Sequence, residues 1–491
     1  MEYTELKDYR LPGGTLVDWE PTADANRWYE DPRRLSYMHA EHVRRAIDAG
    51  DRWGSMWIGT AFRIEARLDR AAMASTIECW YQRHEAFRTR VQELPDALPG
   101  DVLTRFTLPA DAVSVRPRTI GTALTGDEVG AAVSEYFDRA VSPLRWPHCL
   151  FVTVEPDDGQ GFVVVFGADH TAMDAYTQVF AIRELTTLFT AAVSGVPHGL
   201  RGFGSYLDFS DAERELGDKL DANSSAVNGW RAFFESTVTP VQPEPMPSFP
   251  AFPADDPAPI TVSPPRQPDP GFQASLSLWL LDAVETERFH TICKAGGASM
   301  ASGIYTALSM ATSRLTGTGD LRFISPVHTR MSAEWGEAAG WFVGIIPVAL
   351  RSGGAESFSS ALAPISRSAD QFKSVGGAPF TPIADLIGGD TTPPGFVVSY
   401  IDLRRDPGAA EWEARAARVL RSAVADADEV YFWINRIPGG TNVSARYPAG
   451  GSTRKRVELF LTVFREILHE IVSTGDAYYT RAVDTSRAQA R

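Results

Sequence analysis

A histidine and an aspartate four residues apart form the clearest chemical motif in the sequence. His170 and Asp174 lie in the segment Gly-Ala-Asp-His-Thr-Ala-Met-Asp-Ala at residues 167–175, an HxxxD pattern. Histidine titrates near neutral pH and is the side chain most often used for proton abstraction. An aspartate at this spacing can orient the loop or pair with a distant arginine. Two fixed residues in five positions are a weak signal, and alone they favour a histidine that is hydrogen-bonded in a strand-to-helix turn.

The elements around this motif would place both side chains at one junction. Apolar, β-rich runs predict strands at 148–155 and 161–167, with a Pro-Asp-Asp-Gly-Gln turn between them. Apolar residues recur with a helical period over 173–193. His170 therefore follows a strand end, and Asp174 lies in the first turn of a helix.

The rest of the chain divides at a proline-rich stretch. Twelve of the 33 prolines lie between Pro240 and Pro270, where they favour extended, irregular backbone. We expect an N-terminal lobe at 1–238, a linker at 239–270, a C-terminal lobe at 271–475 and a loose tail at 476–491. The further elements that we expect are strands at 57–67, 272–281, 321–327, 341–350, 395–401, 429–437 and 441–447, and helices at 35–49, 69–84, 284–295, 300–315, 358–373 and 454–472.

Composition excludes several classes of protein. The 491 residues contain 47 basic and 62 acidic side chains, a formal charge of −15, which leaves no electrostatic footprint for nucleic acid. No apolar stretch approaches the roughly 20 residues of a membrane-spanning helix. The three cysteines lie far apart with no CxxC pair, which excludes a thiolate zinc site. With no signal peptide visible at Met1, these features indicate a cytoplasmic protein, which we expect to be a monomer.

Several short motifs, in order along the chain, resemble those of the condensation-domain superfamily, which has the fold of chloramphenicol acetyltransferase. Among its members, the sequence is most similar to free-standing actinobacterial polyketide-associated acyltransferases. The segments that carry the resemblance are Arg-His-Glu-Ala-Phe-Arg-Thr at 83–89, His170 with Asp174, Tyr-Leu-Asp-Phe at 206–209, Arg330, Gly-Trp-Phe-Val-Gly at 340–344, Pro-Phe at 379–380, Ser-Tyr-Ile-Asp at 399–402 and Trp-Ile-Asn-Arg at 433–436.

The resemblance implies an α/β (α+β) fold with two chloramphenicol-acetyltransferase-like lobes that form a V around a tunnel. His170 would act as general base in mid-tunnel. The donor would be an acyl thioester of coenzyme A or of a phosphopantetheinyl carrier protein, and the acceptor an alcohol or amine. Ester formation in lipid or natural-product biosynthesis is favoured over amide formation. No bound cofactor, no metal and no acyl-enzyme intermediate are expected.

The resemblance also assigns roles to further residues. Asp174 would pair with Arg330 of the other lobe, and Arg83, His84, Glu85 and Arg88 would form a structural network. The oxyanion donor stays open between a backbone N–H near Ala175 and the side chain of Asn435. The residues expected along the substrate tunnel are Asp169, Ala175, Trp341, Ser399, Trp433 and Asn435.

Three departures from the family pattern support an alternative. Asp169 replaces the first histidine of the family's pair, Ala175 replaces a glycine, and Gly344 replaces an asparagine. The alternative is a degenerate, non-catalytic module that binds a carrier protein or another partner. A tunnel open at both ends around His170 would favour the enzyme. A third reading, an epimerase-like relative, needs an added carboxylate base that the sequence does not locate.

We expect several other histidines and arginines to lie on the protein surface. His39 and His42 are spaced i, i+3 on a predicted helix, and we expect them to be solvent-exposed rather than metal ligands. An acyl or peptidyl carrier protein is a candidate partner, although the acidic average requires a local basic patch for docking. The candidate pieces of such a patch are Arg33-Arg34, Arg44-Arg45, Arg404-Arg405 and Arg454-Lys455-Arg456.

Overall fold

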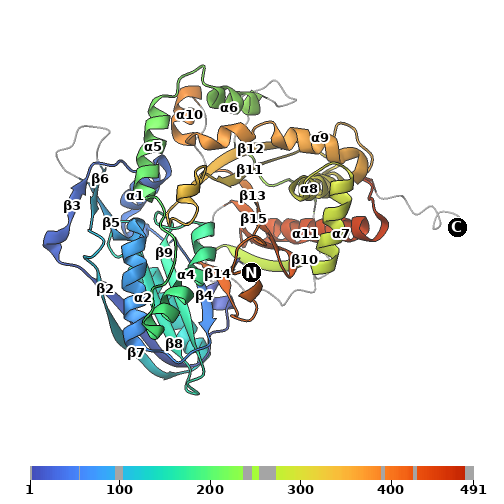
Figure 1. Ribbon diagram of the computed structural model, residues 1–491. Coiled ribbons are helices and arrows are strands. Elements are labelled where there is room, and N and C mark those ends of the chain that lie inside the picture. Colours follow the sequence, from blue (N-terminus) through green and yellow to red (C-terminus); the bar gives the residue numbers. More distant parts are fainter. Residues whose placement is uncertain are drawn as a thin grey trace.

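Two large β-sheets organise the chain, one in each of two lobes (Figure 1). The computed structural model describes residues 3–54, 56–93, 103–235, 246–253, 272–388, 393–423 and 428–480. Helices and strands alternate in both lobes, which confirms the mixed α/β fold class. Among these residues, no helix is long and apolar enough to cross a membrane.

The sheet of the first lobe has seven strands, and a small sheet of three strands lies beside it. In spatial order the large sheet contains β1 (Tyr3–Glu5), β14 (Arg418–Arg421), β4 (Trp57–Ile64), β9 (Phe162–Asp169), β8 (Cys149–Glu155), β2 (Gly14–Thr22) and β7 (Ser114–Leu124). The small sheet contains β3 (Tyr29–Asp31), β6 (Leu103–Thr107) and β5 (Thr89–Glu93). The strands β8 and β9 pair antiparallel, as the predicted hairpin requires.

Helices cover both faces of the seven-stranded sheet. Alternate residues of β9 show this directly, because Val164 and Phe166 belong to the core under α2 (Arg70–Arg83) and α4 (Ala175–Ser194). Val163 and Val165 instead belong to the core under α3 (Gly126–Ala140). Successive side chains of a strand point to opposite faces, so β9 is apolar from Phe162 to Ala168. The remaining helices of this lobe are α1 (Tyr37–Ala49) and α5 (Tyr206–Asp218).

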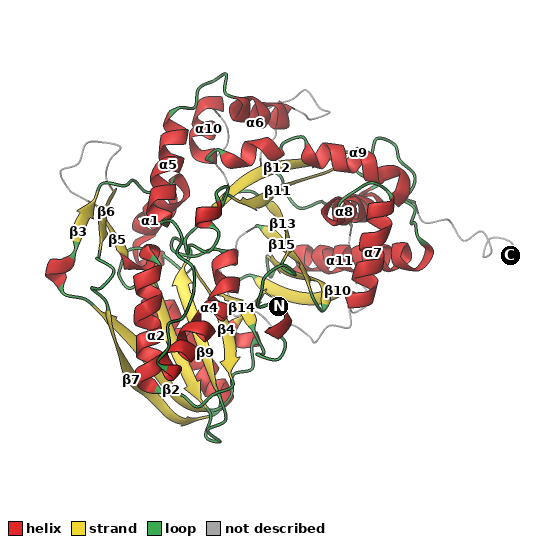
Figure 2. Cartoon of the chain, in the orientation of Figure 1, coloured by secondary structure: helices red, strands yellow, loops and turns green. Residues whose placement is uncertain are grey.

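The second lobe is built on a six-stranded sheet. Its strands, in spatial order, are β10 (Ala274–Asp282), β16 (Gly440–Tyr447), β15 (Val430–Ile437), β13 (Phe396–Asp402), β11 (Leu321–His328) and β12 (Val343–Leu350). Figure 2 shows helices gathered on the outer side of this sheet. The helices of this lobe are α7 (Ala283–Ala295), α8 (Met300–Thr316), α9 (Phe358–Asp370), α11 (Gly451–Thr474), α6 (Ser225–Glu235) and α10 (Phe380–Ile387).

One strand crosses from the second half of the chain into the first lobe. The four-residue strand β14 lies between β1 and β4, parallel to the former and antiparallel to the latter. The buried amide of Gln178 fixes this neighbour relation, because its Nε2 donates to the carbonyl oxygens of Gly59 at 2.5 Å and Leu420 at 2.9 Å. The second half of the chain therefore completes the first sheet, a crossing that the predicted division into lobes at 239–270 does not contain.

Parts of the expected linker and tail are packed. Phe249, inside the predicted linker, lies 5.2 Å from the ring of Phe396, and the main chain of Phe396 donates to Pro247. Residues 236–245 and 254–271 lie outside the described residues, so the linker at 239–270 stays a prediction elsewhere. The looseness expected for the tail is wrong at its start, because Tyr479 is 6% exposed and packs in the core of the second lobe. Residues 481–491 lie outside the described residues.

Candidate functional site

The predicted strand-to-helix junction positions His170. Strand β9 ends at Asp169, and α4 begins at Ala175 with Asp174 as its N-cap. Asp174 caps the helix because its Oδ1 accepts a hydrogen bond from the main-chain N–H of Thr177 at 2.9 Å. The intervening turn holds the half-buried His170 next to a loop of the second half of the chain, residues 329–342.

Trp341 of that loop contacts the His170 imidazole face to face. The ring centroids lie 4.4 Å apart with 30° between the planes. Burial lowers the pKa of His170, and the nearby His42 ring acts in the same direction. A lowered pKa keeps the imidazole neutral at neutral pH, which is the form that accepts a proton. His170 is therefore suited to act as a base.

Asp174 and Arg330 form a buried ion pair between the α4 N-terminus and the loop. Arg330 Nη2 donates to Asp174 Oδ1 at 3.0 Å, and Nη1 donates to Oδ2. The two side chains are only 5% and 2% exposed. Asp174 also accepts from the Thr177 hydroxyl and from the main-chain N–H of Phe342, at 2.9 and 3.2 Å. The carboxylate oxygens are thus occupied by donors, and the geometry suits organisation of the loop rather than proton transfer.

Asp169 faces away from the solvent and pairs with His42. Its carboxylate accepts from the Thr171 main chain at 2.9 Å and from the Thr171 hydroxyl at 2.7 Å, and His42 Nε2 lies 3.4 Å away. Burial alone would raise the pKa of Asp169, but His42 and Thr171 outweigh it and lower the pKa to about 2. The expectation that His39 and His42 are exposed is wrong, since they are 5% and 1% exposed. Helix α1 is covered by the turn after β9, which a helical spacing cannot reveal.

The Arg-His-Glu motif at 83–85 forms a buried charge network. Arg83 Nε and His84 Nε2 both contact Glu184 Oε1, at 2.6 and 3.0 Å. The Nδ1 of His84 accepts from the main-chain N–H of Ala339 at 3.3 Å, so this residue too contacts the loop from the second half. Glu184 is a site residue that the sequence does not identify, because a single acidic residue on a helix carries no distinguishing signal.

Glu85 and Arg88 hold other segments of the first lobe. Glu85 pairs with Arg33, whose Nη2 lies 2.9 Å from Oε1. Arg88 donates through Nε to the carbonyl oxygen of Tyr81 at 2.7 Å and also to that of Leu108. None of these four motif residues contacts His170 in the described interactions, which agrees with a structural role.

Two glycines explain how the loop can lie so close. Gly340 has φ of 157°, and a Cβ there would lie 2.3 Å from Cγ of Tyr206. A Cβ on Gly344 would lie 2.3 Å from the carbonyl oxygen of Gly376. The asparagine of the family pattern therefore has no room at Gly344 without a backbone shift. Ala175, the other small-residue departure, is the partly exposed first residue of α4.

The remaining predicted tunnel residues lie on two parallel strands of the second sheet. Ser399 of β13 is the register partner of Trp433 of β15. Trp433 packs against the core of the first lobe and stacks on Tyr431, with centroids 3.9 Å apart. Asn435 is 1% exposed and donates to Asn442 at 3.2 Å, which leaves its buried Oδ1 without a partner among the described residues. No described contact joins these three side chains to His170.

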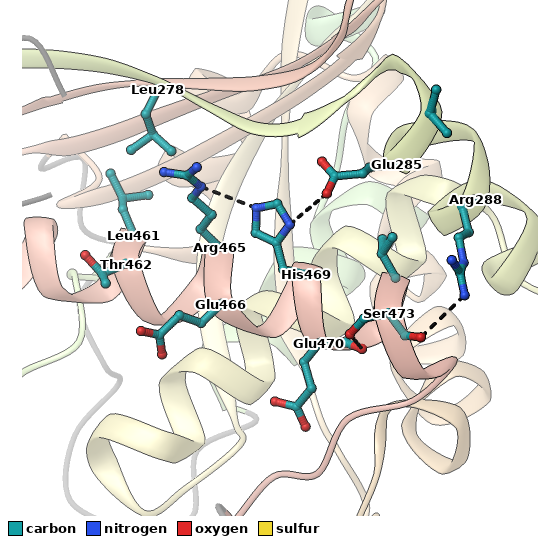
Figure 3. A pocket seen from close by; sticks show the side chains of 12 residues that line it. Leu278, Glu285, Arg288, Leu461, Thr462, Arg465, Glu466, His469, Glu470 and Ser473 are labelled. Atoms are coloured by element: carbon teal, nitrogen blue, oxygen red, sulfur yellow. Dashed lines mark hydrogen bonds and ion pairs between the residues drawn. The ribbon is translucent and has the colours of Figure 1, made fainter. Parts of the chain in front are cut away.

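A cavity of about 820 Å³ lies elsewhere, between β10, α7 and α11 (Figure 3). His469 donates from Nδ1 to Glu285 at 3.0 Å and receives a hydrogen bond from Arg465 Nε at 3.4 Å. Both imidazole nitrogens are thus engaged in hydrogen bonds, and Leu278 and Leu461 are among the apolar residues that line the cavity. His469 therefore has no nitrogen available to accept a proton from a substrate. Among the described residues, no group of three or more histidine, cysteine or acidic side chains is placed to hold a metal ion.

The chain is similar to named acyltransferases over almost its whole length. It is 25% identical to the acyltransferase PapA3 of Mycobacterium tuberculosis, over 96% of both chains. It is 26% identical to the 2'-acyl-2-O-sulfo-trehalose (hydroxy)phthioceranyltransferase PapA1 of the same organism, over 97% of this chain and 90% of the relative. A solved structure described as PapA2 acyl transferase superposes with a TM-score of 0.82 at 21% identity, and covers 96% of this chain and 100% of its own.

The fold extends to more distant solved structures. The condensation domain of the polyketide synthase MokA superposes with a TM-score of 0.71 at 14% identity, over 92% of this chain and 99% of its own. The two-lobed fold and the full-length relatives define the class of this protein: it is an acyltransferase with the chloramphenicol-acetyltransferase-like fold. The family described as condensation domain matches residues 54–392. The chain belongs to the condensation-domain family.

Proposed function

We propose that this protein transfers an acyl group from a thioester to a hydroxyl group, with His170 as the general base. The observation that carries the proposal is the partly exposed imidazole at the junction of the lobes, whose pKa burial lowers. Asp174, the other residue of the HxxxD pattern, would act by holding the loop, because its oxygens are taken by Arg330, Thr177 and Phe342.

The proposed reaction is direct transfer without an acyl-enzyme. His170 removes the acceptor proton as the hydroxyl oxygen attacks the thioester carbonyl, and the C–O bond forms. The C–S bond then breaks, and the imidazolium returns its proton to the leaving thiolate. Cys149 does not suit a nucleophilic role, since burial raises its pKa to about 12. The thioester is consumed as a substrate, so the reaction needs no bound cofactor.

The names of the relatives support a hydroxyl acceptor. Two of them act, by name, on sulfated trehalose, a sugar that offers hydroxyl groups: the PapA1 transferase and the trehalose-2-sulfate acyltransferase PapA2. An ester of a carbohydrate or lipid hydroxyl, made in lipid biosynthesis, is therefore the product class that we propose. Amide formation is the second outcome of the same test.

Each of the four candidate basic patches has at least one arginine paired with a neighbouring carboxylate, including Arg45 with Glu41 at 3.8 Å. Arg34 pairs with Asp211 and Asp218, Arg404 with Asp402 and Glu287, and Arg454 with Glu458. A carrier protein with an acidic docking surface would find less free positive charge at these places than the sequence suggests. We therefore propose a coenzyme A thioester as the first donor to test, with a loaded carrier protein as the second.

The experiment is mass spectrometry of products from a panel of acyl thioesters and hydroxyl or amine acceptors. The variant His170→Ala should reduce the rate by about 10²- to 10⁴-fold, the usual contribution of a general base. The control His290→Ala changes a histidine on α7 and should keep full activity. Wild-type rates in His170→Ala would reject the proposed base. Absence of product from every donor and acceptor, with tight binding of a carrier protein, would favour the non-catalytic module.

A further inference from the structure

Two buried carboxylates flank His170 in the sequence, and each is held by a partner from another part of the chain. Asp174 is held by Arg330, as described above. Asp169 is held by His42, which lies on α1. Asp169 stands where the family pattern has its first histidine, and the histidine that contacts it, His42, lies 127 positions earlier in the chain.

A buried carboxylate at this position needs its partner. Asp169 and His42 are each 1% exposed, and an ionised carboxylate taken out of water costs several kcal/mol unless hydrogen bonds and opposite charge compensate it. Thr171 supplies two donors, and both go to Oδ1. His42 Nε2 lies 3.4 Å from each of the two carboxylate oxygens, and with its proton on Nε2 the imidazole donates to the carboxylate. The pair fixes the main chain immediately before His170.

His42 also contacts the residue that covers the imidazole. Its ring meets Trp341 edge-on, with centroids 5.6 Å apart and 89° between the planes. On the other side His42 meets Trp53 edge-on at 5.0 Å. Trp341 in turn stacks on His170, and its neighbour Phe342 donates its main-chain N–H to Asp174. Asp169 therefore contacts His42, His42 contacts Trp341, and Trp341 contacts His170, while the neighbouring Phe342 binds Asp174 at the other end of the turn.

The imidazole depends on this packing for its orientation. Nδ1 of His170 is buried and has no side-chain hydrogen-bond partner among the described residues. A base acts efficiently only when its other nitrogen points at the reacting proton, and a displacement of about 1 Å can cost about a hundredfold in rate. The stacking of Trp341 is thus the main described restraint on the ring.

From these contacts we infer that His42 is a positioning residue for His170. Its hydrogen bond to Asp169 and its edge-on contact with Trp341 together hold the His170 imidazole in place. The inference rests on the proposed function of His170 as base. His42 itself does not touch the substrate. Its removal leaves the base present but less well oriented, so turnover falls while binding of donor and acceptor persists.

The test measures kcat and KM for variants of the full-length protein. His42→Phe keeps a ring against Trp341 and Trp53 but removes the bond to Asp169, and should lower kcat at least tenfold with KM changed less than threefold. His42→Gln places an amide N–H near the former Nε2 and should restore kcat to within threefold of wild type. His39→Phe changes another buried histidine of α1 and is the matched control, with kcat unchanged.

Asp169→Asn provides an independent arm, which remains informative if His42→Phe does not fold. It should lower kcat to a similar degree, and combined with His42→Phe it should lower kcat no further, because both changes break the same contact. Wild-type kcat in Asp169→Asn, additive losses in the double variant, or a Gln variant as slow as the Phe variant would each overturn the inference. Full activity of His170→Ala in the same series would instead reject the proposed base, which separates the two failures.

Discussion

Removal of Arg330 should destabilise the fold and slow turnover together. The guanidinium makes two hydrogen bonds to Asp174 and one, at 3.1 Å, to the carbonyl oxygen of Ala338. It also lies over the ring of Phe342, 4.3 Å from the centroid. In Arg330→Ala, Asp174 keeps its other donors but becomes a buried charge without a counter-ion.

The expected size follows from the burial of the pair. Breaking a buried ion pair by removing one partner costs about 3–5 kcal/mol, because the remaining charge stays desolvated. The side chains here are 5% and 2% exposed, so solvent screening does not reduce this figure. Arg34→Ala is the matched control: its side chain is 42% exposed and pairs with exposed carboxylates, and such pairs contribute about 0–1 kcal/mol.

Urea denaturation of wild type, Arg330→Ala, Asp174→Ala and the double variant gives the coupling between the two side chains. The double variant should be less destabilised than the sum of the single variants, because it leaves no unpaired buried charge. Turnover should fall in Arg330→Ala, since the loop that carries Trp341 loses its anchor. Loss of less than about 1 kcal/mol in Arg330→Ala, equal to the Arg34→Ala control, would refute the reasoning.

Three further measurements test other parts of the structure. The rate should rise with pH as His170 loses its proton, and because its pKa is lowered, the acid limb of kcat/KM should have its midpoint below about 6.5; a midpoint above 7 would contradict this. Burial raises the pKa of Glu213 from its ordinary value of 4.5 to about 7, so stability is lost as the pH rises between these two values and the loss is complete above the higher one. Glu213→Gln should therefore be more stable than wild type by about 1–2 kcal/mol at pH 8 and equal to it near pH 4. This figure is smaller than the full pKa shift implies, because the side chain is partly exposed to solvent. Thermal unfolding at both pH values measures the difference. Gly344→Asn, which restores the family residue, should lower the melting temperature by several degrees because of the contact with Gly376, whereas Gly377→Ala, where a Cβ meets open space, should not; equal melting temperatures would show that the loop adapts.

The local signals near the motif predicted its geometry well. The predicted strand at 161–167 and the predicted helix at 173–193 match β9 and α4 to within two residues, because both follow from short-range apolar patterns. Asp174, which the prediction placed in the first turn of the helix, is its N-cap. The pair of Asp174 with Arg330 came from the resemblance, since nothing in the local sequence joins residues 156 positions apart.

Long-range contacts account for what the sequence did not reveal. The spacing of His39 and His42 identifies a helix face but not the segment that covers it, so their burial was missed. Strand β2, Gly14–Thr22, is not among the strands that the sequence predicts. Strand β14 has only four residues, and its place between β1 and β4 depends on partners from the other end of the chain. Such pairings leave no periodic signal.

The crossing of β14 has a consequence for the order in which the protein is made. During synthesis, β4, β8 and β9 leave the ribosome long before residues 418–421, so the first sheet is incomplete while about 250 further residues are added. Strand β1, which precedes β4 in the chain, pairs only with β14 in the described sheet and cannot form that pairing until β14 has been made. The open edge of β4 would then need protection in the nascent chain, because an unpaired strand edge recruits other chains. A truncation before residue 418 should therefore yield an aggregation-prone product rather than an independent first lobe.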